Sequence, residues 1–110
     1  MPRLIYTPRA LADMIRLREF IARHNPEAAA RMSRILKESA ARLKQYPMKG
    51  VLVEDSPFCD LIIPFGASGY ILRYRVIIET KTVVVVGIRH GKEDDVALVV
   101  CFSRREPGGG

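Results

Sequence analysis

The chain has few of the residues that usually hold metals in proteins. It contains two cysteines, Cys59 and Cys101, and two histidines, His24 and His90, with no Cys-x-x-Cys pair and no companions at ligand spacing. Metal sites are built from clusters of such residues. We therefore expect no metal and no cofactor. We expect both cysteines to be small buried hydrophobic residues rather than a disulfide or a nucleophile.

Long hydrophobic runs are also missing. No apolar run reaches the roughly 18 residues that a membrane-spanning helix needs. The first residues, Met1-Pro2-Arg3-Leu4, lack the apolar centre and the small-residue cleavage site of a signal peptide. These absences predict a cytoplasmic protein with no membrane partner.

Several catalytic signatures are absent as well. The chain has no Ser-His-Asp set, no paired carboxylates in its predicted strands and no glycine-rich dinucleotide fingerprint. The segment Gly66-Ala-Ser-Gly69 lacks the Lys-Ser/Thr ending and the following helix of a phosphate-binding loop, so it is typical of a turn. The acidic run Glu93-Asp94-Asp95 is typical of a solvated turn. These absences argue against an enzyme but do not exclude one.

The length and the charge distribution indicate one domain with an uneven surface. The chain has 110 residues, of which 48% are apolar, and a domain of that size buries about two thirds of its unfolded surface. We expect a single domain over residues 1–103 and a disordered tail over 104–110. Residues 1–46 carry ten basic and four acidic residues, whereas 47–110 carry eight of each. The basic first half could bind nucleic acid or an acidic protein, or it could simply form a solvated helix face.

The first half of the chain predicts a strand and two helices. Arg3–Thr7 is apolar and β-branched, as in a short strand. Thr7-Pro8 is a typical helix start, and the helix should stop before Asn25-Pro26, which can begin a second, long helix that Tyr46-Pro47 closes. Two helices joined by so short a link pack antiparallel as a hairpin.

The second half predicts a series of strands. The order strand, helix, helix and then three strands indicates an α+β fold. We expect an N-terminal strand and an antiparallel helical hairpin packed on one face of a three- to five-stranded, mainly antiparallel sheet. The segment Val96–Phe102 fits either a further strand or a short helix. The other predicted extended segments are 51–53, 61–65, 70–78 and 82–88.

The candidate site residues lie on the two longest strands. Side chains alternate along a strand, so Arg73 and Arg75 should face away from the helices. The next strand ends in Arg89, His90 and Lys92, and antiparallel pairing would bring Arg73, Arg89, His90 and Lys92 to one corner. Such a corner can bind phosphate or the carboxylates of an acidic peptide. His90 could act as a general acid or base, or could be a strand-end residue bonded to backbone.

The most specific motif is Gly69-Tyr-Ile-Leu-Arg-Tyr-Arg-Val76 followed by Val83-Val-Val-Val-Gly-Ile-Arg-His-Gly-Lys-Glu93. Together with Leu4-Ile5-Tyr6-Thr7 and the helical hairpin, it makes residues 3–95 resemble the ParE/RelE superfamily of bacterial toxins from type II toxin–antitoxin, or plasmid stabilisation, modules. The pairing of a Gly-Tyr-x-Leu-x-Tyr-x-Val strand with an Ile-Arg-His-Gly ending is closer to the ParE branch. The resemblance implies the RelE/ParE-like fold.

The resemblance implies one of two activities. RelE-like members are ribosome-dependent messenger-RNA endonucleases, whereas ParE-like members are associated with poisoning DNA gyrase. The RelE pattern has lysines where this chain has Leu61 and Ile63, an arginine at Ile71 and a tyrosine near Ala97; only Lys92 stands at a basic RelE position. RNA cleavage needs an activated 2′-hydroxyl, a stabilised phosphorane and a protonated leaving oxygen. The apolar replacements therefore favour the ParE-like activity.

The resemblance also implies partners. We expect a toxin that inhibits DNA gyrase and is neutralised by a cognate antitoxin, whose acidic amphipathic tail wraps the hairpin and the sheet. One alternative is a RelE-like nuclease acting on ribosome-bound messenger RNA; another is an inactive member that serves only as a binding module. Target or antitoxin binding is assigned to Arg73, Arg75, Arg89, His90 and Lys92, and a nuclease would use this set without Arg75.

Overall fold

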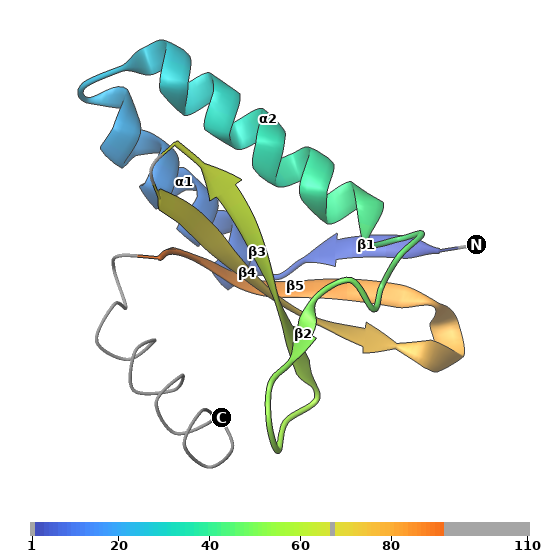
Figure 1. Ribbon diagram of the computed structural model, residues 1–110. Coiled ribbons are helices and arrows are strands. Elements are labelled where there is room, and N and C mark those ends of the chain that lie inside the picture. The colour runs from blue at the N-terminus through green and yellow to red at the C-terminus, as the bar shows by residue number, and fades with distance from the viewer. Residues whose placement is uncertain (1, 67, 92–110) are drawn as a thin grey trace, which may run out of the picture.

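The chain forms two helices and a five-stranded sheet in the computed structural model, which describes residues 2–66 and 68–91 (Figure 1). None of the helices in this part is long and apolar enough to cross a membrane. In chain order the elements are β1 (Arg3–Tyr6), α1 (Pro8–Ala22), α2 (Pro26–Arg42), β2 (Val51–Leu52), β3 (Phe58–Phe65), β4 (Ser68–Ile77), the 3₁₀ turn η1 (Ile78–Thr80) and β5 (Thr82–His90).

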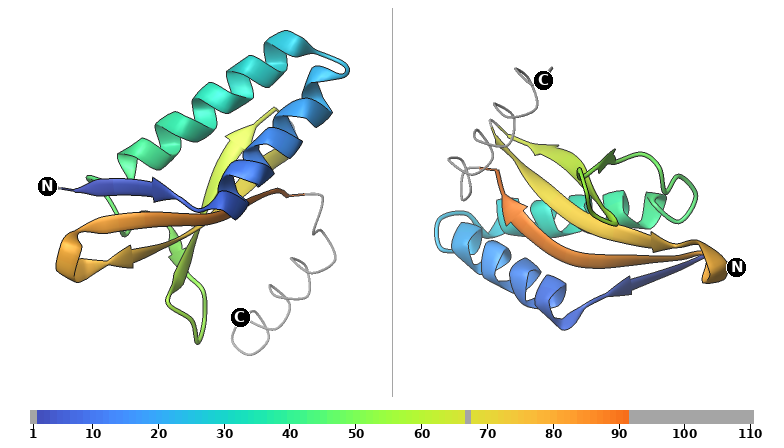
Figure 2. Two further views of the ribbon diagram at one scale, coloured as in Figure 1. Left: turned by 180° about the vertical axis from the view of Figure 1, so that it is seen from behind. Right: turned by 90° about the horizontal axis from the view of Figure 1, so that it is seen from below.

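The sheet has the strand order β1-β5-β4-β3-β2. Strand β1 is parallel to β5, and the remaining neighbours are antiparallel. Both helices lie on one side of this sheet (Figures 1 and 2). The α+β architecture expected from the sequence, a helical hairpin on a mainly antiparallel sheet with an N-terminal strand, is therefore confirmed.

Both helices begin at the caps that the sequence predicts. The Thr7 hydroxyl accepts a hydrogen bond from the Ala10 amide at 3.1 Å, and the Asn25 side chain accepts one from the Ala28 amide at 3.0 Å. A proline follows each cap residue. Helix α2 ends at Arg42, earlier than the expected stop at Tyr46-Pro47, because short bonds such as that from the Leu43 amide to the Ala40 carbonyl tighten the chain there.

The core lies between the hairpin and the sheet. Tyr74 is fully buried in it, and its hydroxyl donates a hydrogen bond to the Pro47 carbonyl at 2.6 Å and accepts one from the Gly50 amide at 2.9 Å. Burial raises the pKa of Tyr74 above its ordinary value. The chain between α2 and β2 is thereby fixed to the middle of the sheet. The other large, fully buried side chains are Met32, Leu36, Leu43, Leu72 and Val85.

Strand β3 starts earlier than the sequence suggests. It begins at Phe58 rather than at Leu61, because Asp60, which interrupts the apolar pattern, pairs with Arg73 across the sheet. Cys59 is buried in this strand, as expected. The expectations for Lys92, Cys101, Val96–Phe102 and the tail over 104–110 fall outside the described residues.

A bulge interrupts the pairing of β4 with β5. Arg73 pairs with Gly87, but Tyr74 pairs with Val85, so Val86 is an additional residue on β5. A bulge shifts the alternation of side chains between the two faces of a strand. The end of β5 consequently presents its side chains on the opposite faces from those that an unbroken alternation would give.

Candidate functional site

The bulge brings three charged side chains together on the sheet face away from the helices, called the open face below. Asp60 lies opposite Arg73, whose Nε and NH2 groups donate to the two carboxylate oxygens at 2.8 and 3.0 Å. Arg89 lies diagonally across from Arg73, and its NH2 group is 4.0 Å from Asp60 Oδ2. Asp60 is therefore shared between the two arginines.

Helix α1 adds a second row of charges beside this cluster. Arg9, Asp13 and Arg16 lie at spacings of four and three residues, which places them on one face of the helix. The Asp13 carboxylate accepts a hydrogen bond from the Ile88 amide at 3.0 Å and lies 3.6 Å from the Arg16 guanidinium. Strand β1 pairs with β5 only as far as Val85. Asp13 therefore supplies the hydrogen-bond acceptor that a neighbouring strand would otherwise provide for the Ile88 amide.

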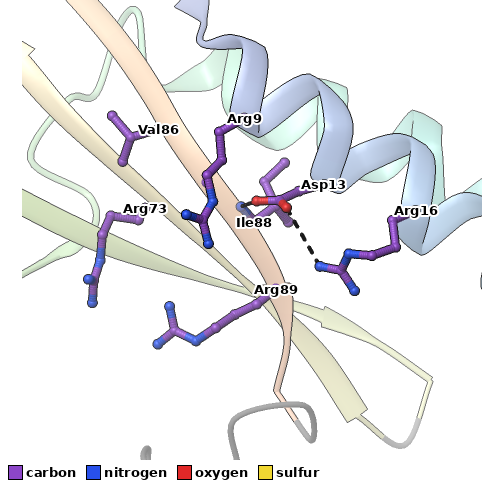
Figure 3. A pocket seen from close by; sticks show the side chains of 8 residues that line it. Arg9, Asp13, Arg16, Arg73, Val86, Ile88 and Arg89 are labelled. Atoms are coloured by element: carbon purple, nitrogen blue, oxygen red, sulfur yellow. Dashed lines mark hydrogen bonds and ion pairs between the residues drawn. The ribbon is translucent and has the colours of Figure 1, made fainter.

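The two rows of charges line one pocket of about 560 Å³. Figure 3 shows Arg9 of α1 and Arg89 of β5 reaching toward each other, with Arg16 beside Asp13 and Arg73 farther from α1. Arginine keeps its charge at any working pH, so this pocket can bind an anion or stabilise negative charge but cannot exchange protons through its arginines. Its lining consists of Arg9, Asp13, Arg16, Arg73, Val86, Gly87, Ile88 and Arg89.

Of the predicted site residues that lie in the described part of the chain, the structure brings Arg73 and Arg89 together in this pocket. Arg75 shares their face but is exposed and does not line the pocket. His90 points to the helix side, where its ring meets that of Tyr70 edge-on at 5.2 Å between centroids. The expectation that His90 would join the arginines is wrong, because neighbouring residues of a strand face opposite sides. Lys92 lies outside the described residues.

Arg9, Asp13 and Arg16, which line this pocket, were missed from the sequence, and so was Asp60, which pairs with the lining residue Arg73. The helical spacing of the first three was visible, but nothing in the sequence indicated which element that helix face would meet. Asp60 could have been found from its position in an apolar run, since a charged residue within a strand usually has a partner across the sheet.

The structure also places two of the positions that were compared with the RelE pattern. Leu61 and Ile63 are buried in the core under the helices, so they do not belong to the open face. The residues of β3 on the open face are Asp60, Ile62 and Pro64, from the alternation of the strand. This face of β3 therefore carries one carboxylate, already paired with Arg73, and two apolar side chains.

A second pocket, here called the hairpin groove, lies between α1 and α2 next to the end of β1. It has a volume of about 320 Å³. Leu11 and Ile15 are 49% and 58% exposed there, so apolar surface remains uncovered. Burial raises the pKa of Tyr6, which forms part of the groove. The lining residues are Tyr6, Leu11, Met14, Ile15, Arg18, Ser33 and Lys37.

Comparison with known proteins identifies relatives over most of the chain. Residues 4–95 match the family of the ParE toxin of the type II toxin–antitoxin system parDE. Toxin RelE2 of Caulobacter vibrioides is 36% identical over 90 residues, covering 82% of this chain and 96% of the relative. Toxin RelE3 of the same organism is 35% identical over 86 residues, covering 78% and 90%.

Two solved structures share the fold. A chain of the chromosomal ParDE system of P. aeruginosa aligns with a TM-score of 0.68 at 20% identity, over 82% of this chain and 96% of that one. A chain of the intact E. coli RelBE toxin–antitoxin complex aligns with a TM-score of 0.55 at 21% identity, over 80% and 94%. With the family match and the relatives above, this places the chain in the ParE toxin family, within the ParE/RelE superfamily of type II toxin–antitoxin toxins.

Proposed function

We propose that the chain is a ParE-like toxin that inhibits DNA gyrase by binding rather than by catalysis. The observation that carries this proposal is the composition of the open face around Arg73 and Arg89. Among the described residues, Ile62 and Pro64 occupy the adjoining positions of β3, and Ile71 is the neighbour of Arg73 on β4. None of these side chains can donate, accept or relay a proton.

RNA cleavage requires groups that this face does not supply in its described part. A general base must activate the 2′-hydroxyl and a general acid must protonate the leaving oxygen. Asp60 is engaged by Arg73 through two hydrogen bonds, and His90 lies on the other side of the sheet. The arginines can stabilise a negative charge, which is only one of the three requirements. A mechanism by protein contact makes no such demand.

The test is gyrase supercoiling of relaxed plasmid with and without the purified protein, with cleaved DNA detected on a gel. We expect supercoiling to be inhibited and double-strand breaks to accumulate when the protein is present. Protein that is shown to be folded and has no effect on gyrase would refute this assignment.

A RelE-like nuclease remains the second candidate, because the curated relatives at 33–36% identity carry the name RelE toxin. Arg73 and Arg89 would stabilise the charge on the phosphorane in that case. The test is cleavage of ribosome-bound messenger RNA by wild type and by His90→Ala. A nuclease that depends on His90 would lose most of its cleavage while still binding its antitoxin. Failure in both the gyrase and the ribosome assays would favour a binding module without toxicity.

We further propose that the hairpin groove receives the antitoxin. Structural neighbours come from complexes named ParDE and RelBE toxin–antitoxin systems, which supports a protein partner of this class. The groove combines exposed Leu11 and Ile15 with the cations Arg18 and Lys37. An amphipathic helix with acidic side chains fits both features, because its apolar face covers the leucine and isoleucine while its carboxylates meet the cations.

A further inference from the structure

We propose that residues 93–102, here called the return segment, fold back over the open face of the sheet in the same chain and cover Ile71. The contact lies within one molecule, so the proposal does not depend on gyrase, on the ribosome or on an antitoxin. Its consequence is regulatory, because a target that binds the open face at this point must first displace the return segment.

Ile71 is buried on a face that no described helix or strand covers. It alternates along β4 with Tyr70 and Leu72, which point into the core, so its own side chain lies on the open face. Only 5% of Ile71 is exposed, yet it does not belong to the core cluster between the hairpin and the sheet. Both helices lie on the other side of the sheet (Figure 2). Ile62, its partner on β3, is 60% exposed on the same face. Something therefore covers Ile71 but leaves Ile62 open.

The neighbouring side chain of Arg89 supplies only part of this cover. Arg89 pairs with Ile71, and its guanidinium reaches Asp60 on β3, so its side chain crosses β4 beside Ile71. Arg89 is itself only 23% exposed, and its Nε atom is buried. Helix α1 does not account for the burial of Ile71, because Ile71 is not among the residues that line the pocket between α1 and Arg89. A further layer therefore lies above Ile71 and Arg89.

The chain leaves the sheet close to Ile71. Just beyond β5, the Gly91 amide donates a hydrogen bond to the Gly69 carbonyl at 2.8 Å, and Gly69 precedes Ile71 by two positions on β4. Residues 92–95 can span about 13 Å when extended, whereas neighbouring strands lie about 5 Å apart. The polar residues before Val96 are therefore long enough to bring the apolar part of the return segment back over Ile71.

The acidic start of the return segment suits the arginines around this point. Glu93-Asp94-Asp95 places three carboxylates directly after the end of the sheet. Arg16, Arg73 and Arg89 each have a further interaction besides those described above, so these arginines are not a vacant anion site. Carboxylates of the same chain are the kind of group that arginine binds through paired N–H donors.

The apolar remainder of the return segment suits Ile71. Val96–Phe102 reads Val-Ala-Leu-Val-Val-Cys-Phe, a run that gains free energy by leaving water for another apolar surface. A second copy of the chain is a poorer occupant of the face, because each copy carries a net charge of +6 and two copies repel one another. A covering segment in the same chain brings its own carboxylates and has no such cost.

The first test is methyl NMR on the full-length protein with labelled isoleucine, leucine and valine methyl groups. We expect nuclear Overhauser contacts between Ile71 and methyl groups of residues 96–102. A sample that mixes labelled and unlabelled chains separates contacts within one chain from contacts between copies. Contacts of Ile71 with β3, β4 and β5 alone, or contacts with residues 96–102 of another copy, would overturn the proposal.

The second test uses the variant Val99→Asp with Val100→Asp. Adjacent side chains point in different directions, so at least one of the two new carboxylates disrupts an apolar contact with the sheet. The matched control is Pro107→Asp with Gly108→Asp, which adds the same charge beyond the return segment. The measured quantity is the relaxation of the Ile71 and Ile62 methyl groups by a soluble paramagnetic agent.

In wild type and in the control, we expect Ile71 to relax about twelvefold less than Ile62, the ratio of their exposed fractions of 5% and 60%. In the segment variant, the relaxation of Ile71 should rise toward that of Ile62, while the methyl shifts of buried Leu72 stay unchanged and show that the sheet is intact. Unchanged protection of Ile71 in the segment variant would overturn the proposal. Protection that appears only after a candidate antitoxin is added would overturn it in favour of that partner.

Discussion

Two side chains, Asp60 and Tyr74, fix the open face and the loop between α2 and β2. Asp60 accepts two hydrogen bonds from Arg73, at 2.8 and 3.0 Å, and such paired, charge-assisted contacts are stronger than neutral ones. Tyr74, adjacent in sequence to Arg73 but facing the core, fixes the loop at Pro47 and Gly50. Neither contact follows from the sequence, because each joins segments that only the sheet register brings together.

Gly50 leaves no room for a side chain. A β-carbon there would lie 2.7 Å from the Tyr74 hydroxyl and 2.9 Å from the Asp60 carbonyl. We therefore expect Gly50→Ala to lower the free energy of unfolding by about 1–3 kcal/mol, the usual cost of overpacking. Chemical denaturation measures this, with exposed Lys49→Ala as the control; equal stabilities of the two variants would contradict the close approach.

Replacing Tyr74 with Phe removes both of its loop contacts. The Gly50 amide and the Pro47 carbonyl would lose this partner, at a cost of about 1–3 kcal/mol in unfolding free energy. The folded state raises the pKa of Tyr74 above 10.0 by burial, so the stabilisation from the neutral phenol is complete below that pH and is lost as pH rises further. Wild type should therefore lose more stability than Tyr74→Phe between neutral and strongly alkaline pH, as measured by denaturation at each pH. Parallel loss in the two proteins would be the contrary result.

At the scale of elements, the types of the helices and strands and their order along the chain could be predicted from the sequence, but the bulge in β5 could not. Thr7 and Asn25 are caps with a recognisable pattern, so the two helices could be placed. The bulge at Val86 could not, because Val83 to Ile88 are all apolar except one glycine and show no alternation that a shift could interrupt. The bulge puts Arg89 on the face of Arg73 and His90 on the other, so the sequence predicted that the two arginines meet but not which of their neighbours join them.

Asp13 joins α1 to the part of β5 that β1 leaves uncovered. We expect Asp13→Ala to cost about 1–3 kcal/mol of unfolding free energy, because the Ile88 amide loses its acceptor. Asp13→Asn should cost less, since its amide oxygen can still accept. Thermal or chemical denaturation of both, with exposed Glu19→Ala as the control, checks the order. A loss in Asp13→Asn as large as that in Asp13→Ala would mean that the charge, not the hydrogen bond, matters.

At the scale of the whole molecule, α1 separates two kinds of surface. One side of it lines the arginine pocket, and another lines the hairpin groove. The sequence indicated a basic first half, but the division of that half between the two surfaces depends on the docking of α1 against β5. The antitoxin proposal can therefore be tested by substitutions in the hairpin groove that leave the lining of the arginine pocket unchanged.

The antitoxin proposal gives a prediction for the groove. Ile15 is 58% exposed, so Ile15→Asp should leave the fold intact, and it should weaken antitoxin binding by at least about tenfold, as expected for a central apolar contact. The same substitution at Ile78, which is 79% exposed in η1 and outside the groove, is the control. Calorimetric titration with a candidate antitoxin measures both. Equal affinity of the two variants would move the antitoxin away from this groove.

The most direct test of the account uses one preparation of folded protein in two assays, gyrase supercoiling and cleavage of messenger RNA on ribosomes. The account predicts inhibited supercoiling with trapped double-strand breaks and intact messenger RNA. Cleaved messenger RNA with unimpaired gyrase would contradict it and assign the chain to the nuclease branch of its superfamily.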